Sequence, residues 1–208
     1  MLDQLVAAGH LRALARGEML TRRGGSFDAL AVLIEGGLES SITRADGHRL
    51  LLGYLQPGDM IGFIGLIDGR GHVTDLRARE PCWLLMLPRA TLLSMRAQHP
   101  EIVAACERQL ALRSRLLYDR LAADPSLPVE ARLARLLLGW GDLYGLPRGD
   151  AVVLDMKLSQ ADLADTLGVS RQRVNAAIKQ LQQSGAIRTA YSKISLSDLA
   201  RLRDAALA

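Results

Sequence analysis

The spacing of hydrophobic positions changes along the chain and divides it into two parts. Between residues 17 and 87 the apolar runs are short, as in Ala29–Ile34 and Cys82–Leu87, and turn-forming Gly, Pro and Asp residues separate them. Short apolar runs between turn residues are typical of antiparallel strands in a sandwich or roll. This part is therefore predicted to be an antiparallel β-roll, and the preceding stretch Leu2–Arg16 to form a short helix.

One hairpin can be placed within the predicted roll. Asp46-Gly47 lies between the segments Leu38–Thr43 and Arg49–Leu55. Asp-Gly tolerates a positive φ at both positions, which suits it to a hairpin turn. The two segments are therefore predicted to pair as antiparallel strands.

Helical spacing begins near Arg89 and dominates residues 101–123. Apolar residues at three-, four- and seven-residue steps line one face of this segment: Val103, Cys106, Leu110, Leu117 and Leu121. Such spacing predicts a long amphipathic helix. We expect its apolar face to pack against a second copy of the chain in a symmetric dimer. Packing under the β-domain would give the same pattern and stays an alternative.

Two prolines in Asp124–Pro128 interrupt the helical pattern and predict a hinge. Beyond them, Val129–Tyr144 has a helical period, Leu146–Asp150 is predicted to be a loop, and Val152–Leu154 a short strand. The predicted domains are the β-roll at 1–98, the dimerisation helix at 99–123, the hinge at 124–128 and a C-terminal domain at 129–208.

The clearest local motif is a pair of capped helices. Ser159 can cap a helix over Gln160–Leu167, and Asp162 would complete a capping box. Gly168 follows, where a tight turn needs a positive φ. Ser170 can then cap a second helix, from Arg171 to about Ser184. Two short helices joined in this way predict a helix-turn-helix.

The apolar residues of this motif suit a close crossing of its two helices. Leu163 and Leu167 would face Val174 and Ile178, with the small Ala164 at the closest approach and Val169 in the turn. Arg171, Gln172, Asn175 and Lys179 then point outward. In a DNA major groove, Arg reads guanine, and Gln or Asn reads adenine.

Several other polar residues suit contacts with the DNA backbone. Ser170 and Arg173 lie at the start of the second helix, and Ser159 and Gln160 at the start of the first. Ala186–Thr189 and Lys193–Leu196 form a predicted hairpin around Tyr191-Ser192, a wing that places Lys193 for a further phosphate contact. Ser197 is expected to cap a final helix ending near Leu207.

Charge supports this interpretation only locally. The net charge of the whole chain is +4, which by itself does not indicate nucleic acid. From Arg171 to Lys193, however, there are five basic residues and no acidic one. Together, the pattern predicts double-stranded DNA as a partner.

The composition argues against several other classes of protein. No apolar stretch approaches the roughly 18 residues of a membrane helix, and no secretory signal opens the chain, so we expect a cytoplasmic protein without a membrane partner. The two cysteines, Cys82 and Cys106, make neither a disulfide framework nor a CxxC site, and are expected to be buried thiols.

The motifs of enzymes are missing from the sequence. A metal-dependent oxygenase with a related β-barrel needs clustered His and carboxylate ligands, and no such cluster, nucleophile elbow or phosphate loop occurs. We therefore expect no catalytic activity. A docking module that binds no DNA is a further alternative, but it would not need the outward Arg171, Gln172 and Asn175.

With a roll, a long helix, a hinge and a winged helix-turn-helix in this order, the chain resembles the Crp/Fnr family of bacterial transcription regulators. The resemblance rests on Gly58-Asp59-Met60-Ile61-Gly62 with Gly65-Leu66 in the roll, and on Gly168-Val169-Ser170-Arg171-Gln172-Arg173-Val174-Asn175 in the C-terminal domain. It implies an α+β fold, an effector in the cyclic-nucleotide-binding-like roll, a homodimer on a palindromic operator, and RNA polymerase as a partner of an activator.

The resemblance also places a candidate effector pocket at Gly62, Phe63, His72, Val73, Leu117 and Tyr118. Members that bind cyclic AMP carry a Glu after the glycine and an Arg-Ser pair in the following loop. The matching positions here are Phe63, His72 and Val73, if this loop is one residue shorter. Without the Arg, a cyclic phosphate loses its bidentate partner. We therefore do not expect cyclic AMP as the effector.

Other effectors stay open. Two cysteines cannot supply the four ligands of the iron–sulfur members of the family. Haem, with His72 or Met60 as a ligand, an apolar ligand, a redox partner and the absence of any ligand all stay alternatives. The recognition helix differs from the cyclic-AMP type at Gln172, Asn175 and Ala176, so a different operator is expected.

Overall fold

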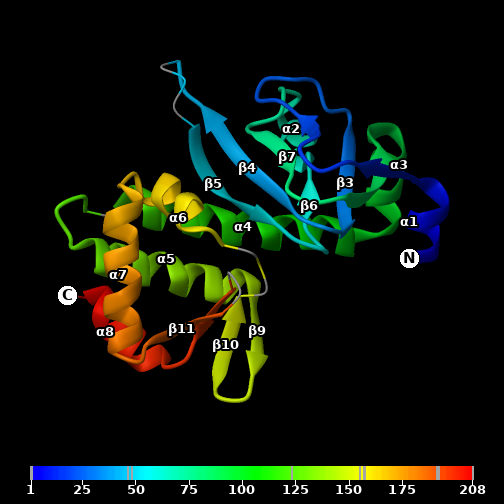
Figure 1. The fold of residues 1–208 in the computed structure, drawn as a ribbon. Helices are drawn as coiled ribbons and strands as arrows, with labels where there is room; N and C mark the ends of the chain where they lie inside the picture. The colour runs from blue at the N-terminus through cyan, green and yellow to red at the C-terminus, as the bar shows by residue number, and fades with distance from the viewer. Residues whose placement is uncertain are drawn as a thin grey trace. The chain divides into compact units, whose positions relative to one another are not determined.

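The computed structural model describes residues 2–207 apart from Asp46, His48, Ala123, Asp155, Lys157, Tyr191 and Ser192. The chain divides into two compact units, Met1–Arg113 and Ser114–Ala208. Figure 1 shows the elements of both, coloured from the blue N-terminus to the red C-terminus. The boundary between the units falls inside one long helix.

The first unit is built on two antiparallel sheets. Its elements are α1 (Leu2–Ala8), β1 (His10–Leu14), β2 (Met19–Thr21), β3 (Ala29–Glu35), β4 (Leu38–Thr43), β5 (Arg49–Leu55), β6 (Met60–Ile61), α2 (Phe63–Asp68), β7 (Asp75–Ala78), β8 (Cys82–Pro88), α3 (Arg89–Gln98) and the start of α4 (Pro100–Ala122). One four-stranded sheet has the order β1-β8-β3-β6 and the other β2-β7-β4-β5. The predicted antiparallel β-domain and the long helix are confirmed.

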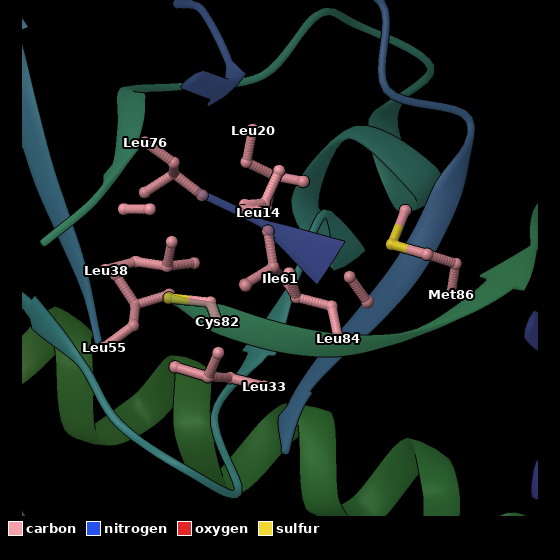
Figure 2. Packing of buried hydrophobic residues seen from close by; sticks show 12 residues of the cluster. Leu14, Leu20, Leu33, Leu38, Leu55, Ile61, Leu76, Cys82, Leu84 and Met86 are labelled. Carbon is pink, nitrogen blue, oxygen red and sulfur yellow. The ribbon is translucent and has the colours of Figure 1, made fainter. Parts of the chain in front are cut away.

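The main core of this unit lies between the two sheets. Buried apolar side chains come from both, as Figure 2 shows: Leu14, Leu33, Ile61, Cys82, Leu84 and Met86 from one, and Leu20, Leu38, Leu55 and Leu76 from the other. Leu33, Leu38 and Leu84 are fully buried. Each such leucine contributes about 1.5–3 kcal/mol by leaving water, so this core is the main support of the roll.

A second apolar cluster joins the helices to the roll. Its buried members are Leu30 and Leu87 from the strands, Phe63 and Leu66 from α2, Leu92 and Met95 from α3, and Ile102 and Cys106 from α4. The amide of Gln109 adds a polar clamp, because it accepts from the Met60 N–H (2.8 Å) and donates to the Met60 carbonyl (2.7 Å). The start of α4 is thereby fixed to β6.

The second unit combines helices with a small sheet. After the end of α4 come α5 (Val129–Tyr144), β9 (Gly145–Arg148), β10 (Ala151–Leu154), α6 (Gln160–Leu167), α7 (Arg171–Gln183), β11 (Ile187–Ala190), β12 (Lys193–Leu196) and α8 (Leu199–Leu207). The sheet order is β11-β12-β10-β9. α5 packs against α7 and α8 and buries Leu133, Leu137 and Trp140. Gly139 lets Leu116 of α4 approach α5 closely.

Two of the predicted segments are wrong in part. The helix expected within Leu2–Arg16 ends at Ala8, and His10–Leu14 is a strand paired with β8. The change from helix to strand needs glycine at position 9, because the Cβ of any other residue would lie 2.7 Å from the Leu85 side chain. The loop expected at Leu146–Asp150 is largely strand β9. β9 is an edge strand, with no neighbouring strand on its outer side. Pro147 can be accommodated there, because an edge strand does not need every backbone N–H for a hydrogen bond to a neighbour.

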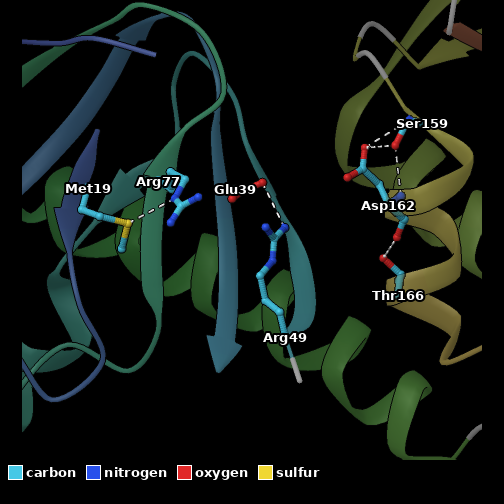
Figure 3. Close-up of polar contacts among 7 residues, drawn as sticks. All are labelled: Met19, Glu39, Arg49, Arg77, Ser159, Asp162 and Thr166. Carbon is cyan, nitrogen blue, oxygen red and sulfur yellow. Dashed lines mark hydrogen bonds and ion pairs between the residues drawn. The ribbon is translucent and has the colours of Figure 1, made fainter. Parts of the chain in front are cut away.

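The predicted hairpin is confirmed as the pair β4–β5, with Thr43 opposite Arg49. Of its turn, Asp46 lies outside the described residues, and Gly47 has φ 81°. Glu39 and Arg49 add an ion pair of 3.0 Å between these strands (Figure 3). At the other end of the chain, Ser197 does not cap α8. The carboxylate of the next residue, Asp198, does, by accepting from two N–H groups of the first turn.

Replacing Leu84 with Ala tests the role of the core between the sheets. We expect Leu84→Ala to lower the free energy of unfolding of the first unit by about 2–5 kcal/mol, because it leaves a cavity in a fully buried site. Urea denaturation measures this change. Leu11→Ala on the same sheet is the control, since Leu11 is 63% exposed and should change stability by less than about 0.5 kcal/mol. Equal losses would contradict the assignment of the core.

Candidate nucleic-acid interface

The first helix of the predicted helix-turn-helix begins at a complete capping box. The Ser159 Oγ accepts from the Asp162 N–H (3.1 Å), and the Asp162 carboxylate accepts from the Ser159 N–H (3.1 Å). The Thr166 hydroxyl donates to the Asp162 carbonyl one turn later (2.7 Å), as Figure 3 shows. These bonds satisfy N–H groups that a helix start leaves without partners, so α6 has a rigid beginning.

The turn between the two helices depends on Gly168. This residue has φ 65° and ψ 37°, the left-handed conformation that a helix C-terminus often needs. The N–H of Val169 donates back to the Ala164 carbonyl (3.1 Å). Ser170 then caps α7 by accepting from the Arg173 N–H (3.4 Å). The predicted turn and both predicted caps are therefore confirmed.

Buried apolar contacts hold the two helices together. The predicted residues are all buried: Leu163, Ala164 and Leu167 on α6, and Val174 and Ile178 on α7. Val169 in the turn is half-buried. The side chain of Arg132, on α5, also donates to the Leu167 carbonyl at the end of α6. Because packing and carbonyl capping act together, α6 and α7 cross in one defined geometry.

The crossing leaves a polar row on the outer face of α7. Arg171, Asn175 and Lys179 follow one another at four-residue steps, and Gln172 lies beside them. Arg171, Gln172 and Lys179 are exposed and Asn175 is half-buried. Residues at such steps share a helix face, and the neighbouring face carries the buried Val174 and Ile178. We call Arg171, Gln172, Asn175 and Lys179 the reading row.

The remaining predicted DNA contacts lie around the ends of the two helices. Ser159, Gln160, Ser170 and Arg173 are exposed at the starts of α6 and α7. Arg173 also lines a groove of about 240 Å³ between the start of α5 and α7. Cationic and hydroxyl side chains at helix N-termini are suited to bind phosphate oxygens, so these positions fit the edges of a DNA-binding face.

The predicted wing is present as the hairpin β11–β12, with Ala190 opposite Lys193. Lys193 is exposed beside the tip, and the tip residues Tyr191 and Ser192 lie outside the described residues. The amide of Gln182 on α7 donates to the Thr189 hydroxyl (2.9 Å). This bond links the wing to the helix that carries the reading row.

One contact of the interface could not be predicted from the sequence. The Gln160 Nε2 donates to the Asn175 Oδ1 at 3.4 Å and joins the start of α6 to the reading row. The two residues are remote in the sequence, and their contact depends on the angle at which the helices cross. Capping patterns and apolar periods contain no signal for that angle.

The residues of the candidate effector pocket fall in different environments. Gly62 has φ 93° and is the N-cap residue before α2, and a Cβ there would lie 2.4 Å from the Ala29 carbonyl and 2.6 Å from the Phe27 ring. Phe63 is buried in the cluster of helices α2, α3 and α4, and not in the core between the sheets. It lines a cavity of about 250 Å³ there, together with Leu66, Ile67, Leu92, Arg96, Ile102, Val103, Cys106, Glu107 and Leu110. Phe63 is therefore placed to pack, and not to bind a ligand inside the roll.

His72 lies in the loop after α2, where its Nδ1 is 2.8 Å from the Thr74 carbonyl and its ring meets Phe27 edge-on at 5.7 Å. Burial lowers the pKa of His72, and the nearby Arg113 lowers it further, while the Thr74 carbonyl and Asp75 act in the opposite direction. His72 is thus a poor substitute for a permanent cation. Phe27, which packs against both His72 and Gly62, was not predicted.

The other pocket residues have exposed side chains. Val73 is exposed, and Leu117 and Tyr118 are exposed in the second unit. Of the two candidate haem ligands, the Met60 Sδ contacts the Cys106 Sγ at 3.7 Å on the side of the helical cluster, whereas His72 contacts Phe27 beside the core between the sheets. These two side chains therefore do not converge on one haem position.

The predicted dimerisation face divides along α4. Cys106 is only 9% exposed and packs inside the first unit, as expected from the alternative of packing under the β-domain, and its part in a dimer stays a prediction. Val103 and Leu110 are half-buried beside it. Leu117 and Leu121, in contrast, are 51% and 74% exposed. Helical periodicity cannot separate these cases, because the same spacing serves contacts within one chain and between two.

Among the described residues, no group of three or more His, Cys, Asp and Glu side chains could hold a metal ion. Within the same part of the chain, no helix is both long and apolar enough to cross a bilayer. Both cysteines are buried and unpaired, as expected, and burial raises the pKa of each thiol.

The two-sheet domain, the long helix and the exposed reading row beside a wing define a transcription regulator with a winged helix-turn-helix. Comparison with known proteins agrees with this class. The cyclic nucleotide-binding domain family matches residues 11–99, and the Crp-like helix-turn-helix domain family matches residues 131–205. The chain belongs to the Crp/Fnr family.

Relatives of known role cover most of the chain. The CRP-like cAMP-activated global transcriptional regulator of Mycobacterium tuberculosis is 29% identical over 187 residues, which are 90% of this chain and 84% of that protein. The cAMP-activated global transcriptional regulator Vfr of Pseudomonas aeruginosa is 27% identical over 194 residues, 89% of this chain and 88% of that protein. The solved structure of FixK2 from Bradyrhizobium japonicum shares the fold, with a TM-score of 0.77 and 19% identity over 94% of this chain and 96% of that one.

The depressed pKa of His72 predicts a dependence of stability on pH. Because the folded protein holds this imidazole neutral, the unfolded chain takes up the proton first as the pH falls through about 6.5. The contribution of His72 to stability is therefore present above that pH and lost below it. We expect the free energy of unfolding, measured with urea, to fall less in His72→Gln than in the wild type between about pH 7.5 and 5.5. His10→Gln, at an exposed position, is the control, and parallel curves for His72→Gln and the wild type would contradict the assignment.

Proposed function

We propose that this regulator acts as a homodimer that reads a palindromic operator, with α7 of each protomer in a major groove. The observation that carries the proposal is the reading row, Arg171, Gln172, Asn175 and Lys179, on a helix fixed by caps and buried contacts. Major-groove edges present donors and acceptors that Arg, Gln and Asn side chains can distinguish. Two recognition helices in a symmetric dimer would read half-sites about one helical turn apart.

The proposed contacts divide into two kinds. Arg171, Gln172 and Asn175 would bind base edges, with Arg171 on guanine. Phosphate oxygens would be bound by Lys179, at the C-terminal end of the reading row, and by the residues around it: Ser159, Gln160, Ser170, Arg173 and, from the wing, Lys193. All of these phosphate-binding candidates are exposed. Phosphate contacts would position the protein, and base contacts would select the sequence.

The dimer would form along the C-terminal half of α4, within the proposed dimerisation segment 99–123. Leu117 and Leu121 are exposed large apolar side chains one turn apart, and a row of this kind is typical of a protein interface. Residues 124–128 would serve as the hinge to the DNA-binding domain at 129–208. The Asp124 side chain accepts from the Ser126 N–H (2.8 Å) in this segment, and this bond lowers the pKa of Asp124.

The effector of the roll at 1–98 is proposed to be other than cyclic AMP. At the position where a cyclic-AMP site needs an acceptor for the ribose, Phe63 packs into an apolar cluster. At the positions of the Arg-Ser pair, this chain has His72, whose pKa is lowered by burial, and the aliphatic Val73. A cyclic phosphate needs a permanent cation or several donors. If the protein activates transcription, it would also contact RNA polymerase.

Replacing Arg171 tests the proposed function. We expect Arg171→Ala to weaken binding to the preferred operator by roughly 1–3 kcal/mol and to relax the choice of base at one position of each half-site. Fluorescence anisotropy with operator variants measures both effects. Arg203→Ala, at an exposed position of α8 outside the reading row, is the control. Analytical ultracentrifugation should find the same dimer for the wild type, Arg171→Ala and Arg203→Ala. Unchanged operator binding by Arg171→Ala would contradict the proposal.

Calorimetry with cyclic AMP tests the proposed departure from the relatives. We expect no saturable heat at micromolar concentrations of the nucleotide, since the site lacks its Arg. The absorption spectrum of the purified protein addresses the haem alternative. Tight binding of cyclic AMP would refute the argument from Phe63 and His72, and a Soret band would favour haem instead.

A further inference from the structure

The start of α6 touches the middle of the reading row. Gln160 is the first residue of α6 and Asn175 is the fifth of α7, and the Gln160 Nε2 donates to the Asn175 Oδ1 at 3.4 Å. Gln160 is exposed and Asn175 is half-buried. The pair thus links an edge position, suited to a DNA phosphate, with a central position, suited to a base.

The backbones on both sides of this contact are fixed. The capping box of Ser159 and Asp162 holds the first turn of α6 around Gln160. Ser170 caps α7, and the buried Leu163 and Val174 fix the crossing of the two helices. An exposed hydrogen bond contributes little to stability by itself. Between two fixed backbones, however, it determines which way the Asn175 amide faces.

The chemistry of the two amides allows a contact on each side of the pair. A primary amide carries two N–H donors and an oxygen with two lone pairs. Gln160 uses one N–H on Asn175, and the other is suited to a phosphate oxygen. The Asn175 oxygen keeps a second lone pair, and its nitrogen keeps its donors. Asn175 can therefore still form the bidentate contact with N6 and N7 of adenine.

We propose that Gln160 is a positioning residue that couples a DNA phosphate contact to the reading of adenine by Asn175. One N–H of Gln160 orients the Asn175 amide, and the other binds the phosphate. This inference rests on the proposed function. It predicts that Gln160 affects the choice of base at a position it does not touch, whereas a residue that binds only phosphate weakens binding to all sequences alike.

A double-mutant cycle on the full chain tests this coupling. The dissociation constant is measured for the preferred operator and for operators changed at the base pair that Asn175→Ala identifies. We expect Gln160→Ala to lower discrimination at that base pair by at least about threefold, and to lower it no further when Asn175 is already Ala, because residues in one hydrogen-bonded pair are not additive. Gln160→Glu, which suits a helix start but has no N–H to donate, should lose discrimination as well.

Two controls separate the outcomes. Arg173→Gln, which removes a proposed phosphate contact without touching Asn175, should weaken binding to all operators by the same factor. Thermal denaturation should show that every variant is folded. If Gln160→Ala and Gln160→Glu behave like Arg173→Gln, or if the Gln160 and Asn175 effects add, the coupling is refuted while the proposed function stands. If the wild type discriminates between no sequences, the proposed function itself fails, and this inference with it.

Discussion

The close crossing of α6 and α7 is the constraint on which the DNA-binding face depends. Gly168 makes the turn possible through its positive φ, and the buried Leu163 and Val174 set the separation of the helices. Any other residue at position 168 would have a Cβ, and holding it in this left-handed conformation would cost about 1–2 kcal/mol. If the crossing angle changed, the reading row would no longer face one groove, and the Gln160–Asn175 contact would be lost.

Arginine side chains stabilise this arrangement from the surrounding helices. Arg132 binds the Leu167 carbonyl at the end of α6, Arg201 binds the Ser184 carbonyl after α7 (2.5 Å), and Arg135 binds the Ala206 carbonyl in the last turn of α8 (2.7 Å). The last carbonyls of a helix have no partner within it, and a cation there also interacts favourably with the helix dipole. Thus α5 supplies both the apolar support and two of the polar contacts that fix the ends of its neighbours.

The features predictable from the sequence were those that depend on neighbouring residues. The capping box at Ser159, the turn at Gly168 and the strands of the β4–β5 hairpin each follow from local chemistry. Other features were not predictable, for different reasons. Ser197 and Asp198 are adjacent candidates for one cap, and only the backbone path decides between them. The apolar period of α4 gave Cys106 the same weight as Leu121, because burial within one chain and burial between two chains leave the same pattern.

We propose above all that the reading row recognises a particular DNA sequence. Selection of binding sites from random double-stranded DNA, followed by footprinting on the enriched sequence, tests it most directly. We expect a palindrome whose half-sites lie about one helical turn apart and differ from those of the cyclic-AMP-activated relatives. Enrichment of no sequence, or of a single site without symmetry, would contradict it.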